Sequence, residues 1–125
     1  MPSPIVHFEI GCQNSEKAKK FYGDLFGWTF DSYGPAAMVS NIGHGPDGTK
    51  RSDGIGGHLN SLGHPPHQYV TIYAMVEDVQ AALDKAVRLG GKACVPVTEV
   101  PGMGWFAWFT DPEGNTIGLW KTMTP

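Results

Sequence analysis

The sequence consists of two similar halves that are offset by 64 residues. Each half begins with a short stretch of strand-like sequence, residues 5–10 and 69–76, and continues into a segment with the period of an amphipathic helix. Positions of three kinds repeat in register, on the strand face, on the helix face and at the helix terminator: Val6 with Val70, Phe8 with Ile72, Ala18 with Ala82, Leu25 with Leu89 and Gly27 with Gly91. The sequence therefore predicts two copies of one structural unit.

The same order of elements is predicted in both halves. Asn14 or Ser15 can cap the first helix, Asp78 can cap the second, and Gly27 and Gly90-Gly91 are typical helix terminators. Three strand-like segments follow each helix, at 27–30, 36–42 and 54–60 in the first half and at 92–100, 105–110 and 115–121 in the second. The pattern predicts an α+β fold of two tandem βαβββ modules, about 4–61 and 68–123, with a linker at about 62–67.

The alternating first strands assign side chains to two faces. In the first module Val6, Phe8 and Ile10 are expected to face the helix, and His7 and Glu9 to face away from it. In the second module Thr71, Tyr73 and Met75 belong to the away-facing set. The away-facing side chains must also be covered by something. Two curved mixed sheets that face each other would enclose a cleft lined by these side chains. Clefts of this kind are typical places for small-molecule sites.

Composition excludes several classes of function. The chain has 125 residues, a formal net charge of −3 and no stripe of basic residues, so a nucleic-acid partner is not expected. No apolar run reaches membrane-spanning length, and the first ten residues lack the pattern of a secretory signal. Cys12 and Cys94 are 82 residues apart and are expected to be reduced thiols. A single domain in the cytoplasm, without a membrane partner, is predicted.

Three stretches resemble one known superfamily across nearly the whole chain. They are HFEI with KAKKFYGDLFGW near the start, VEDVQAALDKAVRLGGK in the middle and WFTDPEGNTIGLW near the end. With the paired modules, they resemble the vicinal oxygen chelate superfamily, which includes glyoxalase I, bleomycin-resistance proteins, methylmalonyl-CoA epimerase and extradiol dioxygenases. The chain looks most similar to small glyoxalase-like proteins. The resemblance implies a homodimer, and because one scaffold hosts several chemistries and pure binders, it leaves the activity open.

The resemblance also implies where metal ligands would lie. In metal-dependent relatives, the first and last strands of each module each supply one ligand to a divalent ion that acts as a Lewis acid. His7 matches the first position, and His58 lies on the same strand face as Gly56 at another, with Glu9 as a reserve carboxylate. Thr71 is a poor ligand for Zn, Ni or Fe. Gly118, where metal enzymes of this type usually carry glutamate, has no side chain.

The histidine and aromatic side chains suggest two functions that need no metal ion. His7 and Glu9 are candidate catalytic residues, because a carboxylate can orient a histidine that acts as a general base. The second module offers an aromatic wall for a flat or apolar ligand, with one of Trp105 and Trp108 expected to join Trp120. Predicted ligand-binding residues are Thr71, Tyr73, Trp105, Trp108, Trp120, Gly118 and Gly56. Plain packing of the histidine and of the aromatic side chains is the structural alternative.

Three functions follow from these readings. The favoured one is a small-molecule-binding protein of the bleomycin-resistance type with an aromatic cleft and no cofactor. The alternative is a metal-dependent lyase or isomerase of the glyoxalase type that uses His7 with His58 or Glu9. An accessory module without its own ligand is the third, and the sequence does not decide whether the chain is an enzyme.

Overall fold

The computed structural model describes residues 2–40, 43–44, 50–51 and 54–123. The chain divides into two compact units. One is His7–Val70, and the other consists of the part from Thr71 onward together with the residues before His7. The boundary falls just after the segment predicted as a linker. Among the described residues, no helix is long and apolar enough to cross a membrane.

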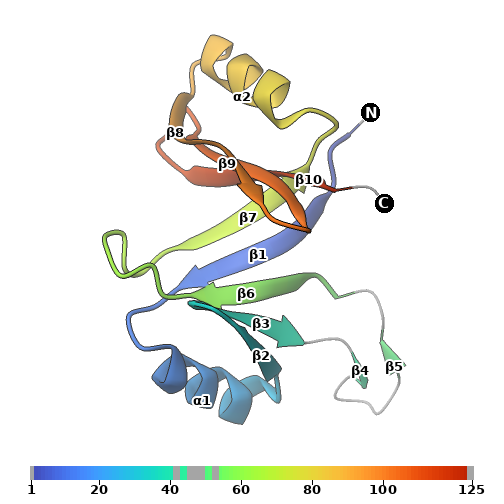
Figure 1. Cartoon of the computed structure of the whole chain (residues 1–125), viewed down its shortest axis with the longest axis vertical. Coiled ribbons are helices and arrows are strands. Elements are labelled where there is room, and N and C mark those ends of the chain that lie inside the picture. The colour runs from blue at the N-terminus through green and yellow to red at the C-terminus, as the bar shows by residue number, and fades with distance from the viewer. Residues whose placement is uncertain (1, 41–42, 45–49, 52–53, 124–125) are drawn as a thin grey trace. The chain divides into compact units, whose positions relative to one another are not determined.

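The first module follows the predicted order of strand, helix and three strands (Figure 1). Its elements are β1 (Ile5–Gly11), α1 (Ser15–Phe26), β2 (Thr29–Tyr33), β3 (Ala36–Ser40) and β6 (Gly56–Asn60). In the sheet β1 pairs in parallel with β6, whereas β6 with β3 and β3 with β2 are antiparallel. The predicted loop at 43–54 contains one more short pairing, β4 (Gly43–His44) with β5 (Lys50–Arg51). The end of the strand predicted at 36–42 lies outside the described residues.

The second module repeats this topology. Its elements are β7 (Val70–Met75), α2 (Val79–Arg88), β8 (Lys92–Val100), β9 (Gly104–Thr110) and β10 (Thr116–Thr122). Strand β7 pairs in parallel with β10, and β10 with β9 and β9 with β8 are antiparallel. Each module therefore has its first strand beside its last, in a mixed four-stranded arrangement. The predicted α+β fold of two βαβββ modules is confirmed.

Local chemistry explains where the helices begin and end. Asn14 accepts a hydrogen bond from the backbone N–H of Lys17, and Asp78 accepts one from that of Ala81, each at 2.9 Å, so both act as N-caps. Gly27 closes α1 with a φ of 73°, a left-handed conformation that favours glycine. The predicted caps are confirmed, and Asn14 rather than Ser15 is the cap of α1.

Each module has its own hydrophobic core between helix and sheet. In the first, Phe8 and Ile10 of β1 pack with Ala18 and Tyr22 of α1 around buried Leu59. In the second, the core comprises buried Val79, Leu83, Ala107 and Leu119, with Val76, Ala82, Val97, Trp105 and Phe109 packed against it. The opposite sheet faces therefore carry the residues that were predicted to point away from the helices.

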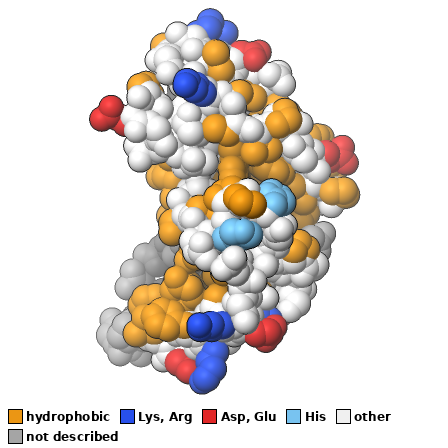
Figure 2. All heavy atoms as spheres, turned by 90° about the vertical axis from the view of Figure 1, so that its left-hand side faces the viewer, with side chains coloured by type: hydrophobic (Ala, Val, Ile, Leu, Met, Phe, Trp, Pro, Cys, Tyr) orange, Lys and Arg blue, Asp and Glu red, His pale blue; other side chains and the backbone are white. Residues whose placement is uncertain are grey.

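The segment between β6 and β7 lies at the surface. Figure 2 looks onto this segment and shows histidine side chains there. His64 is exposed and its Nδ1 lies 2.9 Å from the carbonyl oxygen of Pro65, whereas His67 is half-buried.

Candidate functional site

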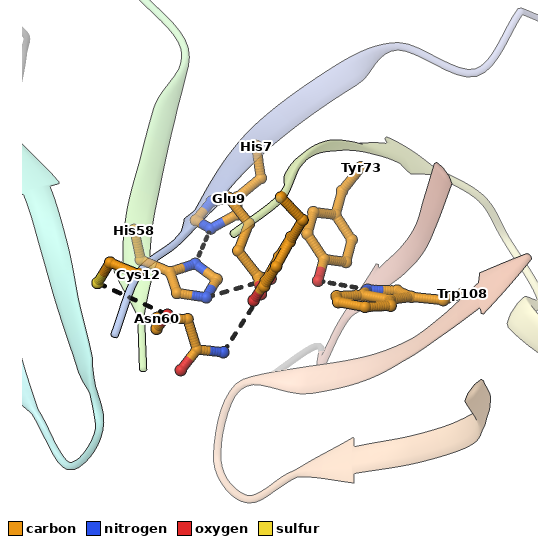
Figure 3. A network of polar contacts seen from close by, with 8 residues as sticks. His7, Glu9, Cys12, His58, Asn60, Tyr73 and Trp108 are labelled. Carbon is orange, nitrogen blue, oxygen red and sulfur yellow. Dashed lines mark hydrogen bonds and ion pairs between the residues drawn. The ribbon is translucent and has the colours of Figure 1, made fainter. Parts of the chain in front are cut away.

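Strand register brings His7, Glu9 and His58 together in the first module. In the parallel pair of β1 and β6, His7 lies opposite Gly56, Glu9 opposite His58 and Gly11 opposite Asn60. Since opposite residues of paired strands point to the same side of the sheet, all of them share the face that turns away from α1. Figure 3 shows the polar side chains of this set converging.

His58 links its two neighbours through opposite sides of its ring. Its Nδ1 lies 2.7 Å from Nε2 of His7, and its Nε2 lies 3.2 Å from Oε1 of Glu9 (Figure 3). A neutral imidazole has one N–H donor and one acceptor nitrogen. If one ring nitrogen of His58 donates in its contact, the other must therefore accept in the second contact. The three side chains form a hydrogen-bonded chain in the order Glu9, His58, His7.

Glu9 is the most deeply buried charged group of the site. Its residue is 2% exposed, and its second carboxylate oxygen, Oε2, accepts hydrogen bonds from the Tyr69 hydroxyl and, at 3.2 Å, from Nδ2 of Asn60. The Tyr69 ring also lies over Gly11, where an added Cβ would come 2.2 Å from the ring. Burial of a carboxylate is tolerable when hydrogen bonds compensate it, and this network supplies them.

Burial also perturbs the titration of the neighbours of Glu9. It lowers the pKa of His7 from 6.5 to about 4; the nearby His58 lowers it further, and Glu9 acts in the opposite direction. Burial and the hydrogen bond and charge of Glu9 raise the pKa of Tyr69 far above its ordinary value, while Asn60 opposes that shift. At neutral pH His7 is therefore uncharged and Tyr69 is a protonated donor.

In the second module, three rows of side chains cross the sheet face that turns away from α2. The register of β9, β10 and β7 places Trp108, Gly118 and Tyr73 in one row and Phe106, Trp120 and Met75 in the next. A third row contains threonines, where Thr110 lies opposite Thr116 and the buried Thr71 hydroxyl donates to the carbonyl oxygen of Thr116 at 2.7 Å. We call the first two rows the aromatic face.

Tyr73 and Trp108 meet above Gly118. The indole N–H of Trp108 donates to the hydroxyl of Tyr73 at 2.7 Å (Figure 3), and a Cβ added to Gly118 would come 2.3 Å from the Tyr73 ring. Both aromatic residues are buried, with 5% and 9% of their surface exposed. Glycine is therefore required at position 118 because the ring of a neighbouring strand occupies the space above it.

The second row is more accessible. Trp120 and Phe106 are half-buried and Met75 is 38% exposed. The indole N–H of Trp120 donates to Oγ1 of Thr122 at 2.9 Å, and Phe106 makes an edge contact with Tyr73. Trp105 points to the opposite side of β9 and packs against the core under α2. Of the two tryptophans that the sequence left open, Trp108 therefore shares the face of Trp120.

The side chains at the expected ligand positions do not fit the metal site of metal-dependent relatives. His58 directs one nitrogen at His7 and the other at Glu9, so the three donors do not converge on one point. Thr71 uses its hydroxyl within the sheet, and the space above Gly118 is filled by Tyr73. Across the described part of the chain, no group of three His, Cys, Asp or Glu side chains is placed to hold an ion.

Sequence reasoning missed Asn60, Tyr69 and Phe106. Alternation along residues 56–60 would have placed Asn60 on the face of His58, and alternation along 105–110 would have placed Phe106 on that of Trp108. Tyr69 lies just before β7, and alternation along 69–76 would have placed it on the face of Thr71 and Tyr73. Its contact with Glu9, 60 residues earlier in the chain, has no signal in the local sequence.

Similar proteins were found by sequence. CFP32 of Mycobacterium bovis, provisionally named a glyoxylase, is 32% identical over 126 residues, which cover 90% of this chain and 43% of CFP32. The anthracycline biosynthesis protein DnrV of Streptomyces peucetius is 27% identical over 136 residues, covering 96% of this chain and 47% of DnrV. The chain thus spans less than half of the length of either relative.

The fold and the family are shown by two further comparisons. A methylmalonyl-CoA epimerase of Streptomyces coelicolor superposes with a TM-score of 0.66 at 16% identity, covering 99% of this chain and 100% of the epimerase, which shows a shared fold. The model of the Glyoxalase/Bleomycin resistance protein/Dioxygenase superfamily matches residues 4–119. As its sequence resemblance predicted, the chain belongs to this superfamily.

Proposed function

We propose that the chain binds a flat, apolar small molecule on the aromatic face of its second module, without the help of a metal ion. The observation that carries this proposal is the pair of Tyr73 and Trp108 above Gly118. Where metal-dependent relatives place a carboxylate, this chain has two aromatic rings that a hydrogen bond holds in place.

The geometry suits a flat ligand for two reasons. The buried pair forms a fixed base, since rings locked by packing and by a hydrogen bond lose little freedom when a ligand arrives. Next to it, Phe106, Trp120 and Met75 offer partly exposed apolar surface on three adjacent strands. Aromatic rings stack on such surfaces with a gain of about 0.5–1.5 kcal/mol per pair beyond the burial of area.

The name of one relative supports the ligand class. DnrV is named for anthracycline biosynthesis, and anthracyclines contain flat, fused aromatic rings. This chain aligns with less than half of DnrV, so the ligand is proposed here only as a chemical class, a fused-ring aromatic compound.

Fluorescence provides the test, with anthraquinone-2-sulfonate as the flat probe. EDTA-treated protein is titrated with the probe, and quenching of tryptophan emission gives the affinity. Trp120→Ala should weaken binding about tenfold, equivalent to about 1.4 kcal/mol. Trp105→Phe, on the opposite side of β9, is the matched control and should bind like the wild type. Absence of quenching in the wild type, or equal effects of both substitutions, would contradict the proposal.

The metal-dependent glyoxalase-type alternative has a separate test. It requires an ion bound through His7 with His58 or Glu9, although those side chains are engaged with one another. Elemental analysis after incubation with Zn²⁺, Ni²⁺ or Fe²⁺ and gel filtration should find no stoichiometric metal. One ion per chain that is lost in His7→Ala would instead favour the lyase or isomerase.

The expected homodimer and the cytoplasmic location stay predictions. Light scattering coupled to gel filtration measures the mass directly and should give twice the 13.5 kDa of one chain.

A further inference from the structure

A pocket of about 330 Å³ lies on the helix side of the second module, on the other side of the sheet from the aromatic face. We propose that this helix-side pocket binds a medium-chain aliphatic carboxylate, independently of the flat compound proposed for the aromatic face. The apolar walls of the pocket come from α2, from β9 and β10 and from the turn between these strands: Ala82, Ala86, Leu89, Phe109, Pro112 and Leu119.

The pocket lies where the first module has a cluster of aromatic rings. At the 64-residue offset, three aromatic positions of the first module recur without a ring: Tyr22 as Ala86, Phe26 as Gly90 and Trp28 as Lys92. The Tyr22 ring stacks on those of Trp28 and Phe26, with centroids 5.4 and 6.1 Å apart, and packs against the core of the first module. Because α2 has alanine at the position of Tyr22, space remains between the helix and the sheet.

The walls of the pocket suit an aliphatic chain. Leu89 is 71% exposed and Phe109 is half-buried at the edge of the second core, so both keep apolar surface in contact with water. A ligand that fills the pocket would supply the packing contacts that these side chains lack. The volume corresponds to about eleven water molecules in the liquid, which leaves room for a chain of medium length.

Lys85 places a positive charge at the mouth of the pocket. Of the described residues that line it, Lys85 is the only one with a charged side chain, and it is exposed. Lysine lays its apolar stem on apolar surface and keeps its ammonium group in water. Within the described part of the chain the Lys85 side chain has no ion pair. The nearby carboxylates are engaged, since Asp84 accepts from Gln80 and Asp111 from Asn115. A carboxylate head group complements this charge.

Nuclear magnetic resonance tests the site on the wild type, with octanoate as the probe. Octanoate should shift the methyl signals of Ala82 and Ala86, and the shifts should saturate with a Kd of about 1 mM or below. Nuclear Overhauser contacts should connect the octanoate chain with Ala86 and Phe109. Absence of saturable shifts, or contacts with Trp120 in place of Ala86, would overturn the proposal.

Two substitutions separate the apolar wall from the charge. Ala86→Tyr restores the ring that the first module has at this position and should abolish octanoate binding. Lys85→Gln should weaken octanoate binding about threefold to fivefold, because an exposed ion pair contributes little, and should leave binding of uncharged octanol unchanged. Lys17→Gln, the same change at an exposed lysine of α1, is the matched control. Equal effects of both lysine substitutions, or undiminished binding in a folded Ala86→Tyr variant, would contradict the proposal.

Light scattering coupled to gel filtration distinguishes a ligand pocket from a contact between copies of the chain. The wild type and Ala86→Tyr should have the same mass. A smaller mass of the variant would mean that a second copy covers the pocket, and would overturn the proposal. Quenching by anthraquinone-2-sulfonate should be the same in both proteins, so the helix-side pocket and the aromatic face are tested separately.

Discussion

The indole N–H of Trp108 donates to the hydroxyl of Tyr73 at 2.7 Å, and the two residues flank Gly118 on adjacent strands. Their contact is possible only because position 118 has no side chain. Glycine at position 118 therefore has two effects. It leaves no carboxylate there to bind a metal ion, and it allows Tyr73 and Trp108 to form a hydrogen-bonded bridge of two aromatic residues across β10.

Substitution of this glycine should show how tightly the bridge is packed. Gly118→Ala places a Cβ 2.3 Å from the Tyr73 ring, and overpacking of this kind costs about 1–3 kcal/mol of the free energy of unfolding. Urea denaturation measures the loss. Gly56→Ala is the control, because its Cβ meets nothing within 4 Å, and it should change stability by less than about 0.5 kcal/mol.

The same packing argument predicts a rescue. In a Tyr73→Ala background the ring is gone, so Gly118→Ala should cost much less than in the wild type. The difference between the two costs, the coupling free energy of the double-mutant cycle, should be about 1–2 kcal/mol. Equal costs in both backgrounds would show that the Tyr73 ring is not what requires glycine at this position.

Tyr73→Phe tests the hydrogen bond separately from the ring. The substitution keeps the ring over Gly118 and leaves the buried Trp108 without this acceptor, which should destabilise the fold by about 1–3 kcal/mol. The ¹⁵N–¹H signal of the Trp108 indole should move upfield as its hydrogen bond is lost. An unchanged signal would argue against the bond.

Stability should depend on pH through His7. Its pKa is about 4 in the folded chain and about 6.5 when unfolded, so the unfolded state takes up a proton first as the pH falls. The stabilisation due to neutral His7 is complete above about pH 6.5 and is lost progressively as the pH falls from 6.5 to 4. Because His7 is partly exposed, we expect a loss of about 1 kcal/mol between pH 7 and pH 5.

Urea denaturation at both pH values checks this expectation. Between pH 7 and pH 5 the wild type should lose about 1 kcal/mol more of its free energy of unfolding than His7→Gln. The comparison removes the contribution of the carboxylates, because both proteins contain them. An identical loss in the two proteins would mean that His7 titrates normally in the folded chain.

The fold could be predicted from the sequence because its signals are local and occur twice. Alternation in β1, the caps at Asn14 and Asp78 and the terminator Gly27 each depend on a few neighbouring residues. The 64-residue offset then showed that the same unit recurs. Local signals of this kind also placed His7 and Glu9 on the correct face of the sheet.

The site required distances that local patterns do not contain. Glu9 meets His58 because β1 and β6 pair in one particular parallel register, and a shift by one residue would place His58 elsewhere. Tyr69 reaches Glu9 from outside the strands. Likewise, the sequence shows that Gly118 has no side chain, but it does not show that the Tyr73 ring occupies the space above this residue.

The most direct test of the central claim follows the four tryptophan indole signals in a ¹⁵N–¹H spectrum while anthraquinone-2-sulfonate is added to metal-free protein. If the aromatic face binds the probe, the signals of Trp120 and Trp108 should shift and saturate together. Those of Trp105 and Trp28, which pack against the helix-side cores, should stay in place. Shifts confined to Trp105 or Trp28, or no saturable shift at all, would contradict the account.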